Sequence, residues 1–311
     1  MTCSALGLGT GRLRSAGGGL SERAAVRLIE QAGALGLNVI DTADSYGQGE
    51  SERAIGRALR GRRDRFILAT KAGFRFSPVG PLIRLVKPAV QLLTRHLAGA
   101  RRAVSAARRS APRTGMLKQD FTPAVVAAAL EASLRRLQSD CVDLFFLHEA
   151  TPEALHDGAL WAALLQLQTQ GKVRGLGVSS NDPAVLAAAL DLPGLAALQT
   201  AVHPARPAAL WPVLAHAAAL GVGIFANQIF RGGRLLADTQ IAAHAQARSL
   251  TPRQWLLAFA LAAPGVSCAL TGTTDSAHLA DNVRDLHTLT AQPVLTWEEL
   301  RGVLPMGDAQ T

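Results

Sequence analysis

The chain has 311 residues, of which 49% are hydrophobic, and its formal net charge is +9. This length and apolar content can bury a large core, and we expect one domain over residues 1–311. The three cysteines are odd in number and far apart, which argues against a disulfide framework or a zinc knuckle and favours a reducing compartment, the cytoplasm. The long uncharged runs are interrupted by proline, glycine or histidine, so we expect no membrane-spanning helix, and no export signal is indicated.

Short apolar runs alternate along the chain with segments of helical spacing. The runs that read as buried strands are residues 4–10, 38–42, 65–71, 141–148, 173–180, 196–202, 222–227 and 266–272. The expected helices are residues 21–35, 51–59, 123–137, 159–170, 183–190, 208–220, 252–263 and 277–286. Thr122, Asp182 and Thr251 each precede a proline, and we expect them to cap the helices that follow.

This alternation predicts an α/β fold of the (β/α)8 TIM-barrel type. Parallel strands need crossover helices, and eight such units close the sheet into a barrel. One segment does not fit the alternation: a long basic insertion, about residues 75–120, follows the third strand. Between Arg75 and Lys118 the chain has ten Arg or Lys residues and no acid.

Three interpretations of the insertion remain open. Its length and partly amphipathic spacing favour an enlarged substrate loop with solvated arginines. A basic lid over an acidic or phosphorylated substrate is the second interpretation. The third is attraction to an anionic membrane surface or to nucleic acid, but aromatic residues do not alternate with the arginines, so specific nucleic-acid binding is not expected.

Polar side chains stand where several predicted strands end. Asp41 ends the second strand, with Tyr46, the only tyrosine of the chain, just beyond it; Lys71 ends the third strand and His148 the fourth. The chemistry of such barrels takes place at these carboxyl ends. Four polar groups at one rim are hard to explain by packing, so we expect a reactive site there.

These segments resemble the aldo-keto reductase family, in order and over nearly the whole chain. GLNVIDTADSYGQGESERAIGRAL is similar to the first signature of that family, and FILATKAG to its lysine strand. EASLRRLQSDCVDLFFLH is similar to its histidine strand with the preceding helix, and ALTGTTDSAHLADNV to its adenosine-binding segment. The resemblance implies a nicotinamide-dependent oxidoreductase that reduces the carbonyl group of a small-molecule aldehyde or ketone.

The resemblance also implies the catalytic residues Asp41, Tyr46, Lys71 and His148. Tyr46 would give a proton to the carbonyl oxygen while hydride reaches the carbon. Lys71 would bring the pKa of Tyr46 down from about 10, and Asp41 would hold the lysine charged. His148 would donate a hydrogen bond to the carbonyl oxygen. An NAD-linked aldose dehydrogenase of the same family and a non-catalytic, cofactor-binding regulatory barrel are the alternatives; substrate, direction and oligomeric state have no signature in the sequence.

The cofactor contacts are likewise implied by the resemblance. They are Gly9, Thr10, Ser179, Ser180, Asn181, Gln199, Asn227, Gln228, Arg231, Gly272, Thr273, Thr274, His278, Asp281 and Asn282. Ser179 and Gln199 occupy carboxamide-binding positions, whereas Asn227 stands where an aromatic ring is common. Gly272 and His278 stand where many relatives carry Lys and Arg for the 2′-phosphate, so NADP(H) is favoured by the family and NAD(H) stays open. No metal site is expected.

Overall fold

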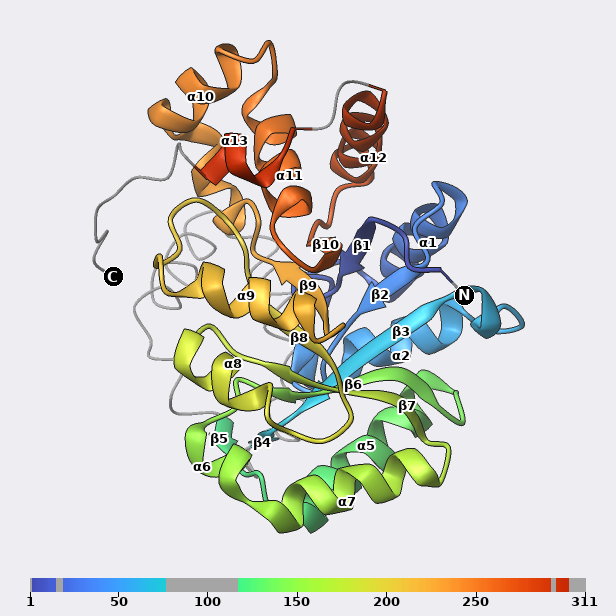
Figure 1. The fold of residues 1–311 in the computed structure, drawn as a ribbon. Helices are drawn as coiled ribbons and strands as arrows, with labels where there is room; N and C mark the ends of the chain where they lie inside the picture. Colours follow the sequence, from blue (N-terminus) through green and yellow to red (C-terminus); the bar gives the residue numbers. More distant parts are fainter. Residues whose placement is uncertain (1, 15–18, 77–116, 292–294, 302–311) are drawn as a thin grey trace, which may run out of the picture.

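The computed structural model describes residues 2–14, 19–76, 117–291 and 295–301, which form a closed barrel of parallel strands surrounded by helices (Figure 1). Around the barrel the strands follow the order β1, β10, β9, β8, β7, β6, β3, β2. Their bounds are Leu6–Gly9 (β1), Val39–Asp41 (β2), Ile67–Ala72 (β3), Val142–His148 (β6), Val173–Ser179 (β7), Leu195–Ala201 (β8), Gly223–Asn227 (β9) and Val266–Thr271 (β10). All eight predicted strands are present, and the predicted (β/α)8 fold is confirmed.

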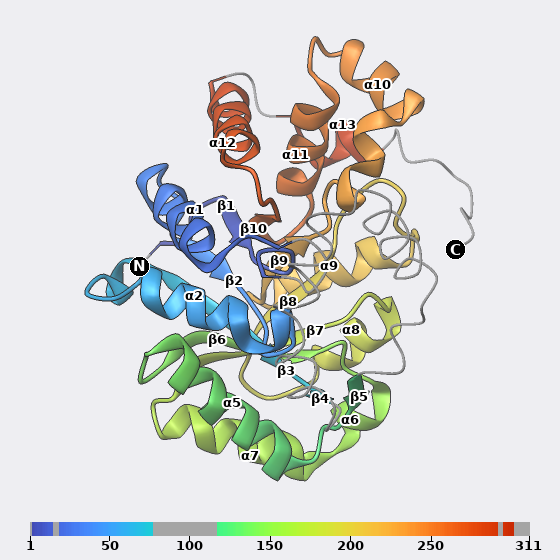
Figure 2. The ribbon, with the colours of Figure 1, turned by 180° about the vertical axis from the view of Figure 1, so that it is seen from behind.

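Helices cover the outside of the barrel (Figures 1 and 2). They are α1 (Glu22–Ala34), α2 (Glu50–Ala58), α5 (Pro123–Leu137), α6 (Pro152–His156), α7 (Gly158–Thr169), α8 (Pro183–Ala189), α9 (Leu210–Ala219), α10 (Thr239–Gln246), α11 (Pro252–Ala262), α12 (Ser276–Thr290) and α13 (Trp297–Arg301). Short 3-10 helices are η1 (Tyr46–Gly49), η2 (Arg63–Arg65) and η4 (Arg231–Ala237). The sequence did not predict the helices α6, α10 and α13. Of these, α6 and α13 have five residues each and are too short to show an apolar period.

Two of the three predicted caps are formed. Asp182 accepts a hydrogen bond from a backbone N–H of α8 at 2.8 Å, and Thr251 forms a capping box at the start of α11. The cap predicted at Thr122 is wrong, because the hydroxyl of Thr122 donates instead to Oδ1 of Asp120 at 2.8 Å. A nearby carboxylate accepts a stronger, charge-assisted hydrogen bond from this hydroxyl.

A two-stranded antiparallel hairpin follows β3. Its strands are β4 (Phe74–Phe76) and β5 (Leu117–Gln119), and Phe76 pairs with Leu117. The predicted basic insertion starts and ends in this hairpin, and residues 77–116 lie outside the described residues. The role of the insertion as a loop, lid or surface contact therefore stays a prediction.

Strand alternation separates two hydrophobic cores. One lies between the sheet and the helices, and the other fills the barrel with Val39, Ala69, Phe146, Ala197, Phe225, Cys268 and Leu270. Successive side chains of a strand point to opposite faces, so a residue two positions after an interior one points into the mouth of the barrel. Asp41, Lys71, His148, Gln199 and Asn227 each stand two positions after such a residue. The strand period therefore brings these polar groups to one mouth.

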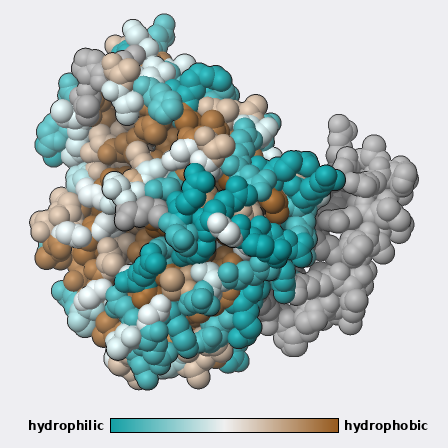
Figure 3. Space-filling model, turned by 90° about the vertical axis from the view of Figure 1, so that its right-hand side faces the viewer, coloured by the Kyte–Doolittle hydropathy of each residue, from teal (hydrophilic) through white to brown (hydrophobic). Residues whose placement is uncertain are grey.

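Large apolar side chains are rare on the described surface. Among the described residues, Leu220 and Leu236 are the ones classed as exposed, at 53% and 38%. Figure 3 shows one side of the molecule, where hydrophilic residues cover much of the middle and apolar residues lie among and above them. Within the described ranges no helix is both long and apolar enough to cross a membrane.

The packing of the barrel interior predicts a cost for enlarging Gly177. A Cβ atom built on Gly177 would lie 2.4 Å from Cδ1 of Phe146 and 2.9 Å from the carbonyl oxygen of Ala197. We expect Gly177→Ala to lower the free energy of unfolding by about 1–3 kcal/mol, measured by urea denaturation. Gly158→Ala is the matched control, because no heavy atom lies within 4 Å of its added Cβ. Equal midpoints for the two variants would contradict the close packing of β7 on Phe146.

Candidate active site

The ammonium group of Lys71 is fully buried at the mouth of the barrel. Its Nζ donates to Oδ1 of Asp41 at 2.7 Å and to the carbonyl oxygen of Thr42 at 2.8 Å. Burial alone lowers the pKa of Lys71, but the charge of Asp41 and the interaction with Tyr46 outweigh it, so the pKa lies above its ordinary value. Lys71 is therefore charged at neutral pH, and its charge is compensated by Asp41.

A tight turn after β2 brings Tyr46 over this ion pair. Residues 47–49, which follow Tyr46, all have positive φ angles. Gly47 is required there, since a Cβ at this position would lie 2.6 Å from the carbonyl oxygen of Arg14. As a result Nζ of Lys71 lies 5.0 Å from the centroid of the Tyr46 ring.

The pKa of Tyr46 moves in the direction opposite to the one that the family resemblance implies. Burial raises it above the ordinary value, Asp41 acts in the same sense, and the charge of Lys71 lowers it by less. Desolvation disfavours the tyrosinate, and the carboxylate next to Lys71 offsets much of the positive charge. Tyr46 is therefore protonated at neutral pH, which is the form that a proton donor needs.

His148 ends β6 and packs between two aromatic rings. The Tyr46 centroid lies 5.8 Å away at 87° and the Phe74 centroid 5.0 Å away at 89°, both edge to face. Oγ of Ser45 lies 3.5 Å from Nδ1 of His148, and with Ser45 as donor the ring hydrogen is on Nε2. Burial, together with Lys71, lowers the pKa of His148 to about 3. The imidazole is therefore neutral and can donate a hydrogen bond, but it holds no extra proton to transfer.

Buried hydrogen bonds join Asp41 to residues predicted to bind the cofactor. Nε2 of Gln199 donates to Oδ1 of Asp41 at 2.8 Å, and Oγ of Ser179 donates to Oε1 of Gln199 at 3.2 Å. The backbone N–H and the hydroxyl of Thr10 both donate to the carbonyl oxygen of Asp41 at 2.9 Å. Ser180 is buried, and its N–H donates to the carbonyl oxygen of Gln199 at 3.1 Å. The hydrogen bond between Gln199 and Asp41 was not predicted, because the two residues are 158 positions apart and no local pattern links them.

Other predicted cofactor residues lie at neighbouring strand ends. Gly9 ends β1 in register with Asp41. Oδ1 of Asn181 accepts from the N–H of Ala201 at 3.1 Å. Asn227 ends β9, and its Oδ1 is buried without a hydrogen-bond partner among the described residues. Such an orphaned oxygen needs a donor from outside the described chain.

The remaining residues predicted to bind the cofactor lie in the loops after β9 and β10 and on α12. Gln228 and Arg231 have left-handed backbones, with φ of 51° and 46°. Gly272, Thr273 and Thr274 follow β10, whereas His278, Asp281 and Asn282 lie on α12. Asp281 forms ion pairs with Arg253 and Arg284, and Asn282 is buried. In the described part of the chain, none of the residues from 272 to 282 forms a hydrogen bond with the four predicted catalytic side chains.

Two buried acids that the sequence did not place at the site lie behind Lys71. Glu52 stands in the first turn of α2, is fully buried and accepts hydrogen bonds from Thr70 at 2.7 Å and from Arg136 at 2.5 Å. Asp44 is also buried, and its Oδ1 has no partner among the described residues. Burial, with Glu52 adding to it, raises the pKa of Asp44 to about 7 against the charges of Arg136 and Lys71.

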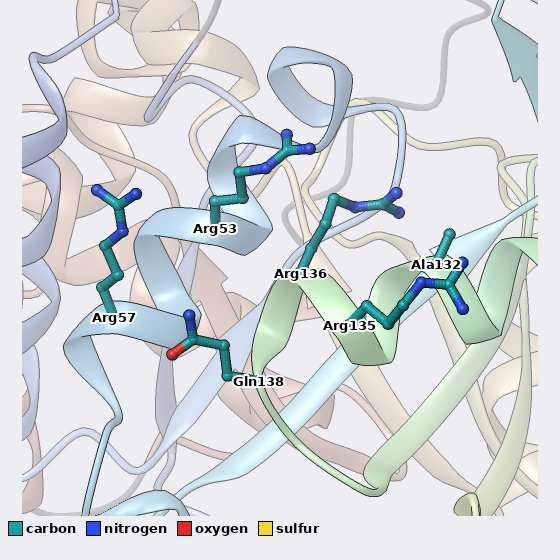
Figure 4. Close-up of a pocket in the computed structure, with 6 residues that line it drawn as sticks. All are labelled: Arg53, Arg57, Ala132, Arg135, Arg136 and Gln138. Carbon is teal, nitrogen blue, oxygen red and sulfur yellow. The ribbon is translucent and has the colours of Figure 1, made fainter.

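An arginine-lined cavity lies between α2 and α5, which run side by side on the outside of the barrel (Figures 2 and 4). Its volume is about 410 Å³, and it is lined by Arg53, Arg57, Ala132, Arg135, Arg136 and Gln138. It contains none of the predicted catalytic residues, so it is distinct from the candidate active site. Arg136 is the link between them, because it pairs with the buried Glu52.

Residues 5–301 match the Aldo/keto reductase family. The chain belongs to this family. It is 32% identical over 247 residues to a D-threo-aldose 1-dehydrogenase from Pseudomonas sp, covering 76% of this chain and 68% of the relative. It is 28% identical over 205 residues to "Aldo-keto reductase yakc [NADP(+)]" from Schizosaccharomyces pombe, covering 65% of this chain and 50% of the relative. The chain thus spans about half the length, or less, of several curated relatives that it matches.

Solved structures of the family share the fold. An aldo/keto reductase from Klebsiella pneumoniae, in complex with NADP and acetate, superimposes with a TM-score of 0.70 at 25% identity. The match covers 99% of this chain and 94% of that one. The predicted membership of the aldo-keto reductase family is therefore confirmed by sequence and by fold.

The single tyrosine of this family member allows a direct test of the electrostatics. Because Tyr46 is the only tyrosine, near-ultraviolet tyrosinate absorbance reports its ionisation alone. We expect the titration midpoint to lie above the ordinary value of about 10, and Lys71→Met to raise it further by removing the opposing positive charge. Tyr46→Phe is the control, which should show no tyrosinate signal. A wild-type midpoint below the ordinary value would show that Lys71 outweighs burial.

The raised pKa of Asp44 predicts a pH dependence of stability. The folded pKa of about 7 exceeds the unfolded value of about 3.9, so the folded state binds the proton more tightly. The contribution of Asp44 to stability is therefore full below about pH 4, falls as the pH rises, and is lost above about pH 7.

Asp44→Asn should remove this loss of stability with rising pH. The wild type should lose unfolding free energy as the pH rises from about 5 to about 8, whereas the variant should not. The difference in unfolding free energy between variant and wild type should therefore grow by roughly 2–4 kcal/mol over this range, as measured by urea denaturation at both pH values. Asp140→Asn, at an exposed position, is the control and should follow the wild type. Parallel pH profiles for Asp44→Asn and wild type would mean that Asp44 is ionised in the folded protein throughout this range.

Proposed function

We propose that this chain is an NAD(P)H-dependent oxidoreductase that reduces an aldehyde or ketone to an alcohol, with Tyr46 as the proton donor. One arrangement carries the proposal: a protonated Tyr46 lies beside a charged Lys71 and a neutral His148 at the mouth of a family barrel. The four residues come from three neighbouring strands, β2, β3 and β6, and from the turn after β2. Relatives of the chain carry NADP in their names or in their structures, which supports a nicotinamide cofactor.

The residues around the mouth fit such a cofactor. The orphaned Oδ1 of Asn227 and the pair of Ser179 and Gln199 offer acceptors and donors to an amide group. Gly232 and Gly233 have φ of 67° and 93°, and Nη2 of Arg12 would lie 2.9 Å from a Cβ built on Gly232. Backbone N–H groups in such a loop beside a guanidinium suit a pyrophosphate. Arg12 was not predicted, because a lone arginine after a strand has no distinctive pattern.

We favour NADP(H) as the cofactor and leave NAD(H) open. When bound, the reduced nicotinamide supplies the hydride for the carbonyl carbon. Gly272 and His278 supply at most one conditional charge for a 2′-phosphate, so discrimination between the two cofactors should be weaker than in a relative with Lys and Arg at these positions.

The proposed chemistry uses a protonated Tyr46, a charged Lys71 and a neutral His148. Nε2–H of neutral His148 donates a hydrogen bond to the carbonyl oxygen and holds it near Tyr46. As negative charge develops on that oxygen, the Tyr46 hydroxyl transfers its proton there, and solvent later returns a proton to the tyrosinate. Lys71 stabilises the tyrosinate, and Asp41 keeps Lys71 charged and in place. Because His148 is neutral, Tyr46 is the better proton donor of the two.

Oxidation of an aldose is the second candidate, and the match to the Pseudomonas sp D-threo-aldose 1-dehydrogenase favours it. In that direction Tyr46 must accept a proton, so tyrosinate has to form first. The raised pKa of Tyr46 makes tyrosinate scarce at neutral pH, and oxidation should therefore accelerate as the pH rises.

Replacement of the tyrosine hydroxyl tests the proposed function. We expect Tyr46→Phe to lower kcat for aldehyde reduction by about 100-fold or more, the usual contribution of a general acid. The dissociation constants of NADPH and NADH, measured by fluorescence titration, should hardly change, because the phenyl ring keeps its place. Turnover is followed with both cofactors over aldehydes and hydroxy sugars. Near wild-type turnover by the variant would exclude Tyr46 as the donor, and cofactor binding without turnover by the wild type would favour a non-catalytic barrel.

A further inference from the structure

Four arginines surround the outer cavity between α2 and α5, a cavity that the proposed carbonyl chemistry does not use. Arg53 and Arg57 come from α2, and Arg135 and Arg136 from the last turn of α5 (Figure 4). The cavity volume of about 410 Å³ lies within the usual range of small-molecule sites, about 300–1,000 Å³. None of the six residues that line the cavity is an acid. An anion that enters it therefore meets no carboxylate among these side chains.

The guanidinium group of Arg136 is held in a fixed orientation at this cavity. Its Nε donates to Oε2 of the buried Glu52 at 2.5 Å, and its Nη2 donates to Oγ of Ser133 at 3.0 Å. Only 17% of the Arg136 side chain is exposed. Its Nη1 forms no hydrogen bond within the described part of the chain. Because a ligand would not have to order this group, little side-chain entropy opposes binding at Nη1.

The acids of the chain leave part of the positive charge around the cavity unpaired. Glu52 pairs with Arg136, and Glu22 pairs with Arg57. Arg135 is exposed and has no acid partner among the described residues. Arg53 and Arg57 stand one helical turn apart on α2, and like charges at this spacing destabilise a helix. An anion bound between the two helices would offset this repulsion.

The remaining polar side chain of the cavity adds an amide donor. Oε1 of Gln138 accepts a hydrogen bond from Nη2 of Arg60 at 3.1 Å, so Nε2 is the atom that Gln138 can offer to a ligand. Guanidinium and amide N–H groups both suit phosphate oxygens, and arginine can bind them through two parallel hydrogen bonds. No aromatic side chain lines the cavity, so a nucleic-acid base would find no stacking partner there.

We propose that this cavity binds a small phosphorylated molecule with at least two phosphate groups. Arginines on both helices line it, so α2 and α5 can each hold a different phosphate of one ligand. The site lies on the outside of the barrel and needs neither Tyr46 nor a nicotinamide cofactor. It is therefore a binding site in addition to the proposed carbonyl reduction and does not rest on it.

Inorganic tripolyphosphate is the probe for this site. Isothermal titration calorimetry of the full chain measures its dissociation constant, and we expect saturable binding that weakens as NaCl is added. Arg135→Gln should raise the dissociation constant about 10-fold, as for the loss of one hydrogen bond to a charged group, and the double variant with Arg53→Gln should raise it further. Orthophosphate, which has a single phosphate group, should bind more weakly than tripolyphosphate.

Ala132, which lines the cavity, offers a matched pair of variants. Ala132→Glu and Ala132→Gln place side chains of similar size there, so weaker binding by the glutamate variant than by the glutamine variant reports the effect of charge. Arg23→Gln, at an exposed position of α1, should keep the wild-type dissociation constant. Thermal unfolding checks that each variant is folded.

Three results would overturn the proposed phosphate site. They are the lack of saturable tripolyphosphate binding by the wild type, equal dissociation constants for the wild type and both arginine variants, and equal affinities for orthophosphate and tripolyphosphate. The second result would place the bound anion elsewhere on the molecule. None of them depends on aldehyde turnover, so the proposed oxidoreductase function is tested separately by Tyr46→Phe.

Discussion

The buried ammonium of Lys71 is the constraint on which the mouth of this barrel depends. An unpaired charge there would cost several kcal/mol of desolvation, so Asp41 and the carbonyl of Thr42 must stay within hydrogen-bond distance. Asp41 is in turn fixed by Gln199 and by Thr10, which ties β1, β2, β3 and β8 together. The directions of the pKa shifts at Tyr46 and His148 follow from this pair and from burial.

Strand β3 separates two polar networks of different character. Lys71 faces the barrel interior and pairs with Asp41, whereas the preceding Thr70 faces outward and donates to Glu52. Glu52 is held by Arg136 of α5, which also lines the outer cavity (Figure 4). One side of the strand positions the reactive groups, and the other anchors the strand to the helical layer. Each buried charge next to β3 thus has a partner of opposite sign: Lys71 pairs with Asp41 inside the barrel, and Glu52 pairs with Arg136 outside it.

The barrel and the position of its four polar residues could be predicted, because both follow from the sequence of strands and helices along the chain. Eight apolar runs separated by helical segments define the fold, and Asp41, Lys71 and His148 stand at the ends of three of these runs. The bond from Gln199 to Asp41 and the burial of Asp44 could not be predicted, since they arise from contacts between residues distant in sequence. The direction of the Tyr46 pKa shift depended on how completely the ring is buried, which no local pattern records.

The hairpin of β4 and β5 has a consequence for how this barrel tolerates change. Phe76 and Leu117 are paired residues, so the long segment that joins them begins and ends at one place on the rim. The entropy of closing a loop between fixed neighbours grows only with the logarithm of its length. Such a segment can be lengthened, shortened or exchanged in evolution at little entropic cost while β3 and α5 keep their places, so recombination at this hairpin can change the chain and leave the barrel as it is.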